Sequence, residues 1–158
     1  RKNEAPTAYV QRVTGLKFDA ALARRAIRGK ALAPVLCSDT TVALGRTILG
    51  KPADAADAMA ILSKLSGQTH RVLTAVAAQV GQNRVTALST SKVSFATMSV
   101  DQIERYIETG EPMGKAGAYG VQGKAAAYIE HISGSYSGIM GLPMYETAQI
   151  LRALGFTI

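Results

Sequence analysis

Two long strand-like segments joined by a short turn constrain the fold of this chain more than any other feature. They run from His70 to Val80 and from Val85 to Thr97, and Gly81-Gln-Asn-Arg84 connects them. A short connection that contains glycine between two such runs is typical of a β-hairpin. Because a hairpin pairs its arms antiparallel, the sheet that contains this one cannot be all-parallel.

Helical patterns alternate with the strand-like segments along the rest of the chain. Apolar residues recur at helical spacing after Pro6, and Ser99 with Gln102 forms a capping box. Asp54 is a suitable N-cap, and Gly67 and Gly110 are suitable helix stops. The predicted helices cover 6–29, 54–66 and 100–109, with a last one that Pro143 opens; the predicted short strands cover 34–38, 47–49 and 127–132.

This alternation predicts an α/β protein in which helices flank a mixed β-sheet. The chain has 158 residues, which suits one domain, and we see no repeat, linker or low-complexity tract that would divide it. We therefore treat residues 1–158 as a single domain.

Composition excludes several classes of protein. No apolar run approaches the roughly 20 residues that cross a bilayer, and no signal peptide is present, so we expect a cytoplasmic protein without a membrane partner. One cysteine, Cys37, and two histidines make a zinc site of the usual ligands improbable on composition. The net charge of +7 attracts anions. Because the basic residues are scattered and no aromatic-studded basic motif occurs, a small anion is favoured over a nucleic acid.

Three charged residues are candidates for chemistry. Asp39 follows the predicted strand 34–38, and the end of a strand is where open α/β folds place ligands. There it could activate a water or hold a divalent metal, or it could merely form a turn. Lys51 precedes Pro52, which restricts its backbone and gives its ammonium group a defined direction towards a phosphate; an ordinary surface turn is the alternative. Lys17 lies on the inner flank of the first helix, where it either points into a site or extends to water.

A glycine-rich segment from Gly110 to Gly123 is the other candidate. Its glycines allow backbone N–H groups to approach a ligand, Lys115 adds charge, and Gln122 can both accept and donate hydrogen bonds to a base edge. It matches neither the GxxxxGK[ST] nor the GxGxxG phosphate-binding pattern, so a flexible connection stays open as the alternative. Arg12 falls nearer the outer flank of the first helix, which favours solvent, but we keep it with Thr40, Gln122 and Lys115 as a candidate substrate-binding residue.

The order and spacing of these pieces resemble the Maf family over almost the whole chain. The motifs that carry the resemblance are Glu4-x-Pro6-x-x-Tyr-Val10-x-Arg12, Lys17, Ser38-Asp-Thr40, Leu49-Gly-Lys-Pro52, Leu65-Ser-Gly67-x-x-His70-x-Val72, Thr74-Ala-Val76, Tyr106-Ile-x-Thr-Gly-Glu-Pro112, Lys115-Ala-Gly-Ala-Tyr-Gly-Val-Gln-Gly123, Gly134-Ser-Tyr136 and Gly141-Leu-Pro143.

The resemblance implies an anvil-like fold related to the inosine-triphosphate pyrophosphatases, with a cleft between two lobes. It also implies an enzyme that hydrolyses nucleoside triphosphates to the monophosphate and pyrophosphate with a divalent metal, Mg²⁺ or Mn²⁺. Asp39 matches the family's catalytic carboxylate and metal ligand, and Lys17 and Lys51 match its phosphate-side lysines. The Asp-Thr pair at Thr40 and the element Tyr-Gly-x-Gln-Gly around Gln122 resemble the dTTP/UTP pyrophosphatase subtype.

The chain departs from the family pattern at its start. The family opens with a strand and a Ser-x-Ser-Pro-Arg-Arg loop that grips the triphosphate, whereas this sequence begins at Arg1. We expect that strand and loop to be absent from these 158 residues. A non-catalytic nucleotide- or partner-binding regulator of septum formation is the alternative function, and the sequence leaves the oligomeric state open, a homodimer included.

Overall fold

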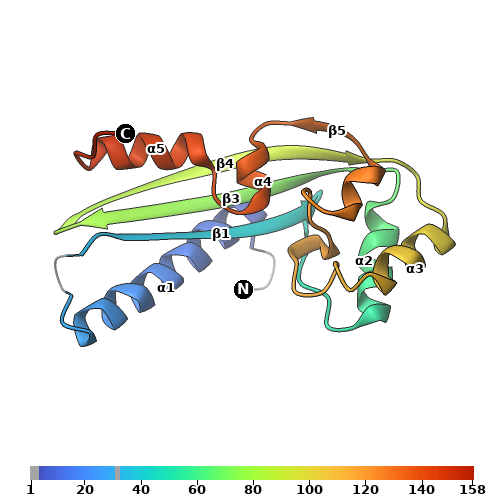
Figure 1. Cartoon of the computed structure of the whole chain (residues 1–158), viewed down its shortest axis with the longest axis horizontal. Helices are drawn as coiled ribbons and strands as arrows, with labels where there is room; N and C mark the ends of the chain where they lie inside the picture. Colours follow the sequence, from blue (N-terminus) through green and yellow to red (C-terminus); the bar gives the residue numbers. More distant parts are fainter. Residues whose placement is uncertain (1–3, 31–32) are drawn as a thin grey trace.

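A five-stranded sheet forms the centre of the computed structural model, which describes residues 4–30 and 33–158 (Figure 1). Helices cover it, so the predicted α/β class with flanking helices is confirmed. In chain order the elements are α1 (Pro6–Ile27), β1 (Val35–Leu44), β2 (Thr47–Leu49), α2 (Ala55–Leu65), β3 (Thr69–Val80), β4 (Asn83–Phe95), α3 (Val100–Glu108), the 3₁₀ helices η1 (Ala116–Ala118) and η2 (Lys124–Tyr128), β5 (Ile129–Ser133), α4 (Tyr136–Met140) and α5 (Met144–Ala153).

The strand order is β2-β1-β3-β4-β5, and every pairing between the described strands is antiparallel. The sequence predicted a mixed sheet, which these pairings do not show. The helix α2 does connect two strands of the same direction, β2 and β3, but β1 lies between them. A crossover helix therefore does not produce a parallel pair here.

The predicted hairpin supplies the two longest strands. β3 and β4 pair continuously from Thr69 opposite Ser94 to Val80 opposite Asn83. Gly81 adopts φ +57° in the tight turn between them, a conformation that favours glycine. Both strands extend along the whole sheet, so they form the platform on which the helices pack (Figure 1).

Opposite faces of β3 contact different helices because successive side chains point to opposite sides of a strand. Val10 of α1 packs with Leu73 and Ala75, whereas Ile150 of α5 packs with Val76 and Ala78 on the other face. The short helix α4 also lies on the α5 side (Figure 1). The sequence reasoning missed α4, whose five residues are too few to show helical periodicity.

A second lobe stands at one end of the sheet and contains α2, α3 and the two 3₁₀ helices (Figure 1). Its helix starts follow the sequence prediction: the Asp54 side chain caps α2, and Ser99 with Gln102 forms the capping box of α3. Leu62 and Tyr106 belong to the apolar core that joins this lobe to the sheet. Within the described ranges, no helix is both long and apolar enough to cross a bilayer.

Candidate active site

Three polar residues, Ser38, Asp39 and Thr40, lie in the middle of β1. The sequence predicted that Asp39 follows the end of this strand, and this prediction is wrong because β1 continues to Leu44. Their register partners on β3 are residues 76, 75 and 74. β2 pairs only with Val42–Leu44, so along residues 35–41 no described strand pairs with the edge of β1 that faces away from β3. This open edge explains why a polar segment can remain a strand, and it places Asp39 where a ligand can reach it.

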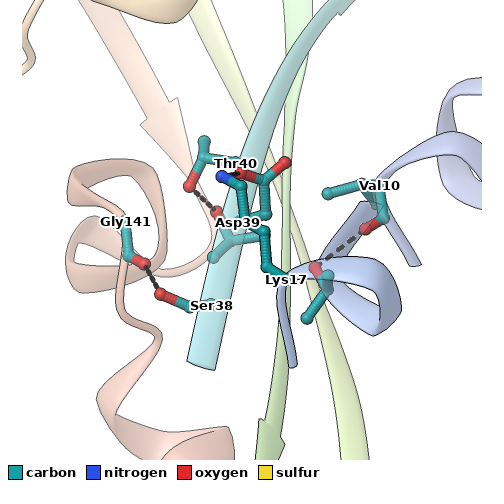
Figure 2. A network of polar contacts seen from close by, with 8 residues as sticks. Val10, Lys17, Ser38, Asp39, Thr40 and Gly141 are labelled. Carbon is teal, nitrogen blue, oxygen red and sulfur yellow. Dashed lines mark hydrogen bonds and ion pairs between the residues drawn. The ribbon is translucent and has the colours of Figure 1, made fainter. Parts of the chain in front are cut away.

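The three side chains diverge, because neighbours on a strand point to opposite faces. Asp39 points towards α1, where its carboxylate forms an ion pair with the Lys17 ammonium group (Figure 2). Ser38 points towards α4 and donates a hydrogen bond to the carbonyl of Gly141 at 2.7 Å (Figure 2). The Lys17 side chain is 56% exposed, so this pair adds no more than about 1 kcal/mol to stability. The ion pair instead orients the Asp39 carboxylate.

Thr40 belongs to a short chain of hydrogen bonds that the sequence reasoning did not identify. Its hydroxyl lies 2.9 Å from the Thr74 hydroxyl, and buried Thr74 donates to the carbonyl of Gly138 in α4 at 2.6 Å. A hydroxyl has one hydrogen, so Thr40 is the donor to Thr74. The Thr40 oxygen therefore faces a ligand as an acceptor.

A cavity of about 280 Å³ opens beside this segment of β1. Lys51, Lys115 and Gln122 line it together with Asp39 and Thr40, and its remaining walls are Ser38, Val42, Val72, Ala116, Tyr119, Gly120, Val121, Ile139, Met140 and Gly141. A second cavity of about 220 Å³ shares Asp39, Thr40 and Lys51 with the first and adds Lys17. The structure thus places the carboxylate, three amines and the amide around two cavities that share Asp39, Thr40 and Lys51.

The turn that carries Lys51 is joined to the glycine-rich segment. The backbone N–H of Gly117 donates to the carbonyl of Gly50 at 2.9 Å. Gly117 has φ +72°, and a Cβ atom there would lie 2.9 Å from a methyl group of Val42. Because only glycine satisfies both conditions, the glycine-rich segment is held against β1 and does not hang free as a flexible connection.

Arg12 is the one candidate that the structure does not bring into either cavity. Its guanidinium group binds the Glu4 carboxylate through two hydrogen bonds of 2.7 and 2.6 Å near the start of α1. The Arg12 hydrogen bonds lower the pKa of Glu4 to about 2. Arg12 therefore stabilises the N-terminal end of α1, the helix that also carries Lys17.

Tyr119, which lines the cavity of about 280 Å³, contacts the buried histidine His70. His70 is 1% exposed, and its Nε2 lies 2.8 Å from the hydroxyl of Tyr119. Nδ1 is buried without a hydrogen-bond partner among the described residues, and the ring packs edge-on against Phe95 and Tyr119. Burial lowers the pKa of His70 from 6.5 to about 4. Protonation would leave a charged ring with an Nδ1–H that has no acceptor among the described residues.

This pKa shift predicts a pH dependence of stability. Between pH 6.5 and 4 the unfolded chain binds a proton at His70 that the folded chain does not. The free energy of unfolding should therefore decrease by up to about 3 kcal/mol as the pH is lowered from 6.5 to 4. Urea denaturation at pH 7.5 and 4.5 measures it. His70→Gln should remove this part of the decline, whereas the exposed-site control His131→Gln should keep it. An unchanged decline in His70→Gln would contradict the prediction.

Comparison with known proteins decides the family. The family described as Maf-like protein matches residues 1–154. This chain belongs to the Maf family. It is 66% identical over 155 residues to a protein of a Polaromonas species named dTTP/UTP pyrophosphatase, covering 98% of this chain and 77% of that relative. Relatives of the same name in Albidiferax ferrireducens and Cupriavidus metallidurans are 64% and 60% identical, covering 99% and 98% of this chain and 78% of each relative.

Asp39 is the single carboxylate among the described residues that line the two cavities. No group of three or more histidine, cysteine, aspartate or glutamate side chains that could hold an ion occurs within residues 4–30 and 33–158. Mg²⁺ is usually bound by one or two carboxylates together with substrate phosphates and water. Asp39, with one carboxylate oxygen on Lys17 and the other directed elsewhere, can supply that single carboxylate.

Proposed function

We propose that this Maf protein hydrolyses dTTP and UTP to the monophosphate and pyrophosphate. The observation that carries the proposal is the shared site in which Asp39, Lys51 and Gln122 line one cavity while Lys17 holds Asp39 from the opposite side. The relatives named dTTP/UTP pyrophosphatase support it. So does the chemistry, because phosphoryl transfer needs mainly positioned charge and an oriented water.

In this proposal Asp39 accepts the proton of the attacking water. The water oxygen forms a bond to the α-phosphorus, the bond to the bridging oxygen breaks in line with it, and pyrophosphate leaves with that electron pair. Lys51, on the proline-restricted turn, neutralises charge on the departing phosphates, and Lys17 keeps the Asp39 carboxylate oriented. A divalent cation, Mg²⁺ or Mn²⁺ in our proposal, would neutralise phosphate charge and polarise the reacting phosphorus. Asp39 is the residue that would hold it.

Gln122 and Thr40 would select the base. A glutamine amide can donate to the O4 of uracil or thymine while its carbonyl accepts from N3–H, which matches that edge of both bases. Gln122 is exposed in the cavity wall, so its amide is available to a ligand. Lys115 donates to the carbonyl of Glu111 at 2.6 Å and has two further hydrogens for a phosphate. We place the reaction in the cytoplasm and leave septum inhibition and dimer formation outside the proposal.

The test is pyrophosphate release from a panel of triphosphates by the full-length protein with Mg²⁺ or Mn²⁺. We expect dTTP and UTP to be hydrolysed fastest, with no turnover after chelation of the metal. Turnover that is undetectable for every triphosphate, by protein that is folded and metal-loaded, would refute the proposal.

Changing Gln122→Glu should reverse part of the base preference. A carboxylate cannot donate to O4 of thymine, but it can accept from the N4 amino group of cytosine. We expect the ratio of kcat/KM for dTTP over dCTP to fall at least about tenfold, because a mispaired polar contact costs roughly 1–3 kcal/mol. The control Gln82→Glu lies in the exposed turn after Gly81 and should leave the ratio unchanged. An unaltered ratio in Gln122→Glu would remove Gln122 from base recognition.

A further inference from the structure

The two ends of the glycine-rich segment meet at one side chain, Glu111. Its carboxylate accepts a hydrogen bond from the backbone N–H of Lys124 at 2.8 Å and a longer one from Ala125 at 3.4 Å. The Tyr106 hydroxyl donates to the same carboxylate at 2.8 Å. Tyr106 is 3% exposed and belongs to the apolar core of the second lobe. Glu111 therefore joins both ends of the segment to a fixed point of the fold.

Gly123 shows that space is reserved for this carboxylate. A Cβ atom at Gly123 would lie 2.3 Å from one carboxylate oxygen of Glu111. The φ angle of Gly123 is −105°, which other residues also adopt, so backbone conformation does not demand glycine here. Glycine is needed here because any side chain at 123 would overlap the Glu111 carboxylate.

The bonds that Glu111 makes keep it ionised. Burial opposes the charge, but the hydrogen bonds from the Lys124 backbone and from Tyr106 outweigh burial, and the pKa of Glu111 is lowered. A carboxylate is also the group that can accept from two backbone N–H groups and a hydroxyl together. Glutamine could accept at only one of its two terminal atoms.

Residues that line the active-site cavity lie inside the loop that Glu111 closes. Gln122 directly precedes Gly123, and the Lys115 ammonium donates to the backbone carbonyl of Glu111 itself at 2.6 Å. The Gln122 side chain is exposed, whereas its neighbour Val121 is buried in the apolar core and fixes the backbone on the N-terminal side of Gln122. On the C-terminal side of Gln122, the Glu111 carboxylate holds the backbone at residues 124 and 125.

We propose that Glu111 is a positioning residue that holds the glycine-rich loop in the shape that presents Gln122 and Lys115 to the nucleotide. The inference rests on the proposed function, since it names the group that sets nucleotide affinity and base discrimination at that site. Glu111 lies outside the residues that line either cavity, so it acts through the loop and not on the reacting atoms.

Two variants remove the contact between the Glu111 carboxylate and the backbone at 123–125. Glu111→Ala removes the carboxylate itself, and Gly123→Ala adds a methyl group in the space that the carboxylate occupies. Glu108→Ala, an exposed carboxylate at the end of α3, is the matched control. Each protein is measured by hydrogen exchange of residues 112–125 without nucleotide and by KM, kcat and base ranking for dTTP, UTP and dCTP.

Both loop variants should exchange at least about tenfold faster over 112–125 while β3 and β4 keep their protection, because the opening free energy of that segment falls. KM for dTTP should rise at least about tenfold and the ranking of bases should flatten, with a smaller change in kcat, since Asp39 and Lys51 lie on other elements. Glu111→Gln should fall between wild type and Glu111→Ala in both measurements.

Unchanged exchange over 112–125 in both loop variants would overturn the proposal, as would unchanged KM and base ranking in a folded, active variant. A loss of kcat alone would also overturn it. If Glu111→Ala does not fold, Gly123→Ala and Glu111→Gln carry the test. Absence of hydrolysis by the wild-type protein would refute the proposed function, and the exchange experiment would still decide whether Glu111 holds the loop.

Discussion

Asp39→Asn should lower kcat for dTTP by at least about 100-fold, because the amide can neither accept the proton of the attacking water nor bind a divalent cation as a carboxylate does. The side chain keeps its shape and an oxygen that can accept from Lys17. The ion pair it loses is partly exposed, with 56% of the Lys17 side chain open to solvent, so the fold should be little affected. Initial rates of pyrophosphate release with full-length protein measure the effect.

The matched control for this experiment is Asp101→Asn. Asp101 is an exposed aspartate in the first turn of α3 and does not line either cavity, so its replacement should leave kcat near the wild-type value. Thermal unfolding of both variants shows that they are folded. A kcat for Asp39→Asn within threefold of wild type would mean that the carboxylate is neither base nor metal ligand.

Gly117→Ala should damage stability and catalysis together. The new Cβ would sit 2.9 Å from Val42 in β1, at a backbone φ of +72° that non-glycine residues adopt at a cost. Overpacking of this kind costs roughly 1–3 kcal/mol and the strained φ about 1 kcal/mol more, so we expect a loss of about 2–4 kcal/mol in the free energy of unfolding. The bond from Gly117 to the carbonyl of Gly50 should break, and kcat/KM should fall at least about tenfold as Lys51 and Lys115 lose their spacing.

Gly114→Ala separates the two causes. Gly114 has a similar φ of +75°, but a Cβ there meets nothing within 4 Å. It should therefore lose only the conformational part, about 1 kcal/mol, and keep most of its activity. Urea denaturation and kcat/KM for dTTP provide the comparison. Equal losses in the two variants would show that contact with Val42 does not hold the loop.

Local sequence patterns were sufficient to predict the boundaries of the capped helices and the position of the long hairpin. Asp54, Ser99 and Gly67 place helix boundaries within a residue or so of those observed, and the glycine at 81 places the long hairpin. These predictions succeeded because a cap or a tight turn depends on residues three or four apart, which the sequence displays directly. The family motifs, too, are visible in order along the chain.

The arrangement of the site depended on contacts that are distant in sequence. Asp39 continues in a strand because β3 pairs with one edge of it while the short β2 leaves the other edge open. Thr74 reaches Gly138, 64 residues away, and that bond sets which way the Thr40 hydroxyl points. No local pattern encodes such a partner.

Sequence by itself determined which residue types this Maf protein has and where most of its helices and strands begin and end. Only the tertiary structure decided that the sheet is antiparallel, that Arg12 pairs with Glu4, and that Glu111 closes the loop around Gln122. The physical reason is that helix caps and turns are satisfied by near neighbours. A sheet edge, an ion pair or a partly buried carboxylate is satisfied by whichever partner folding brings to it.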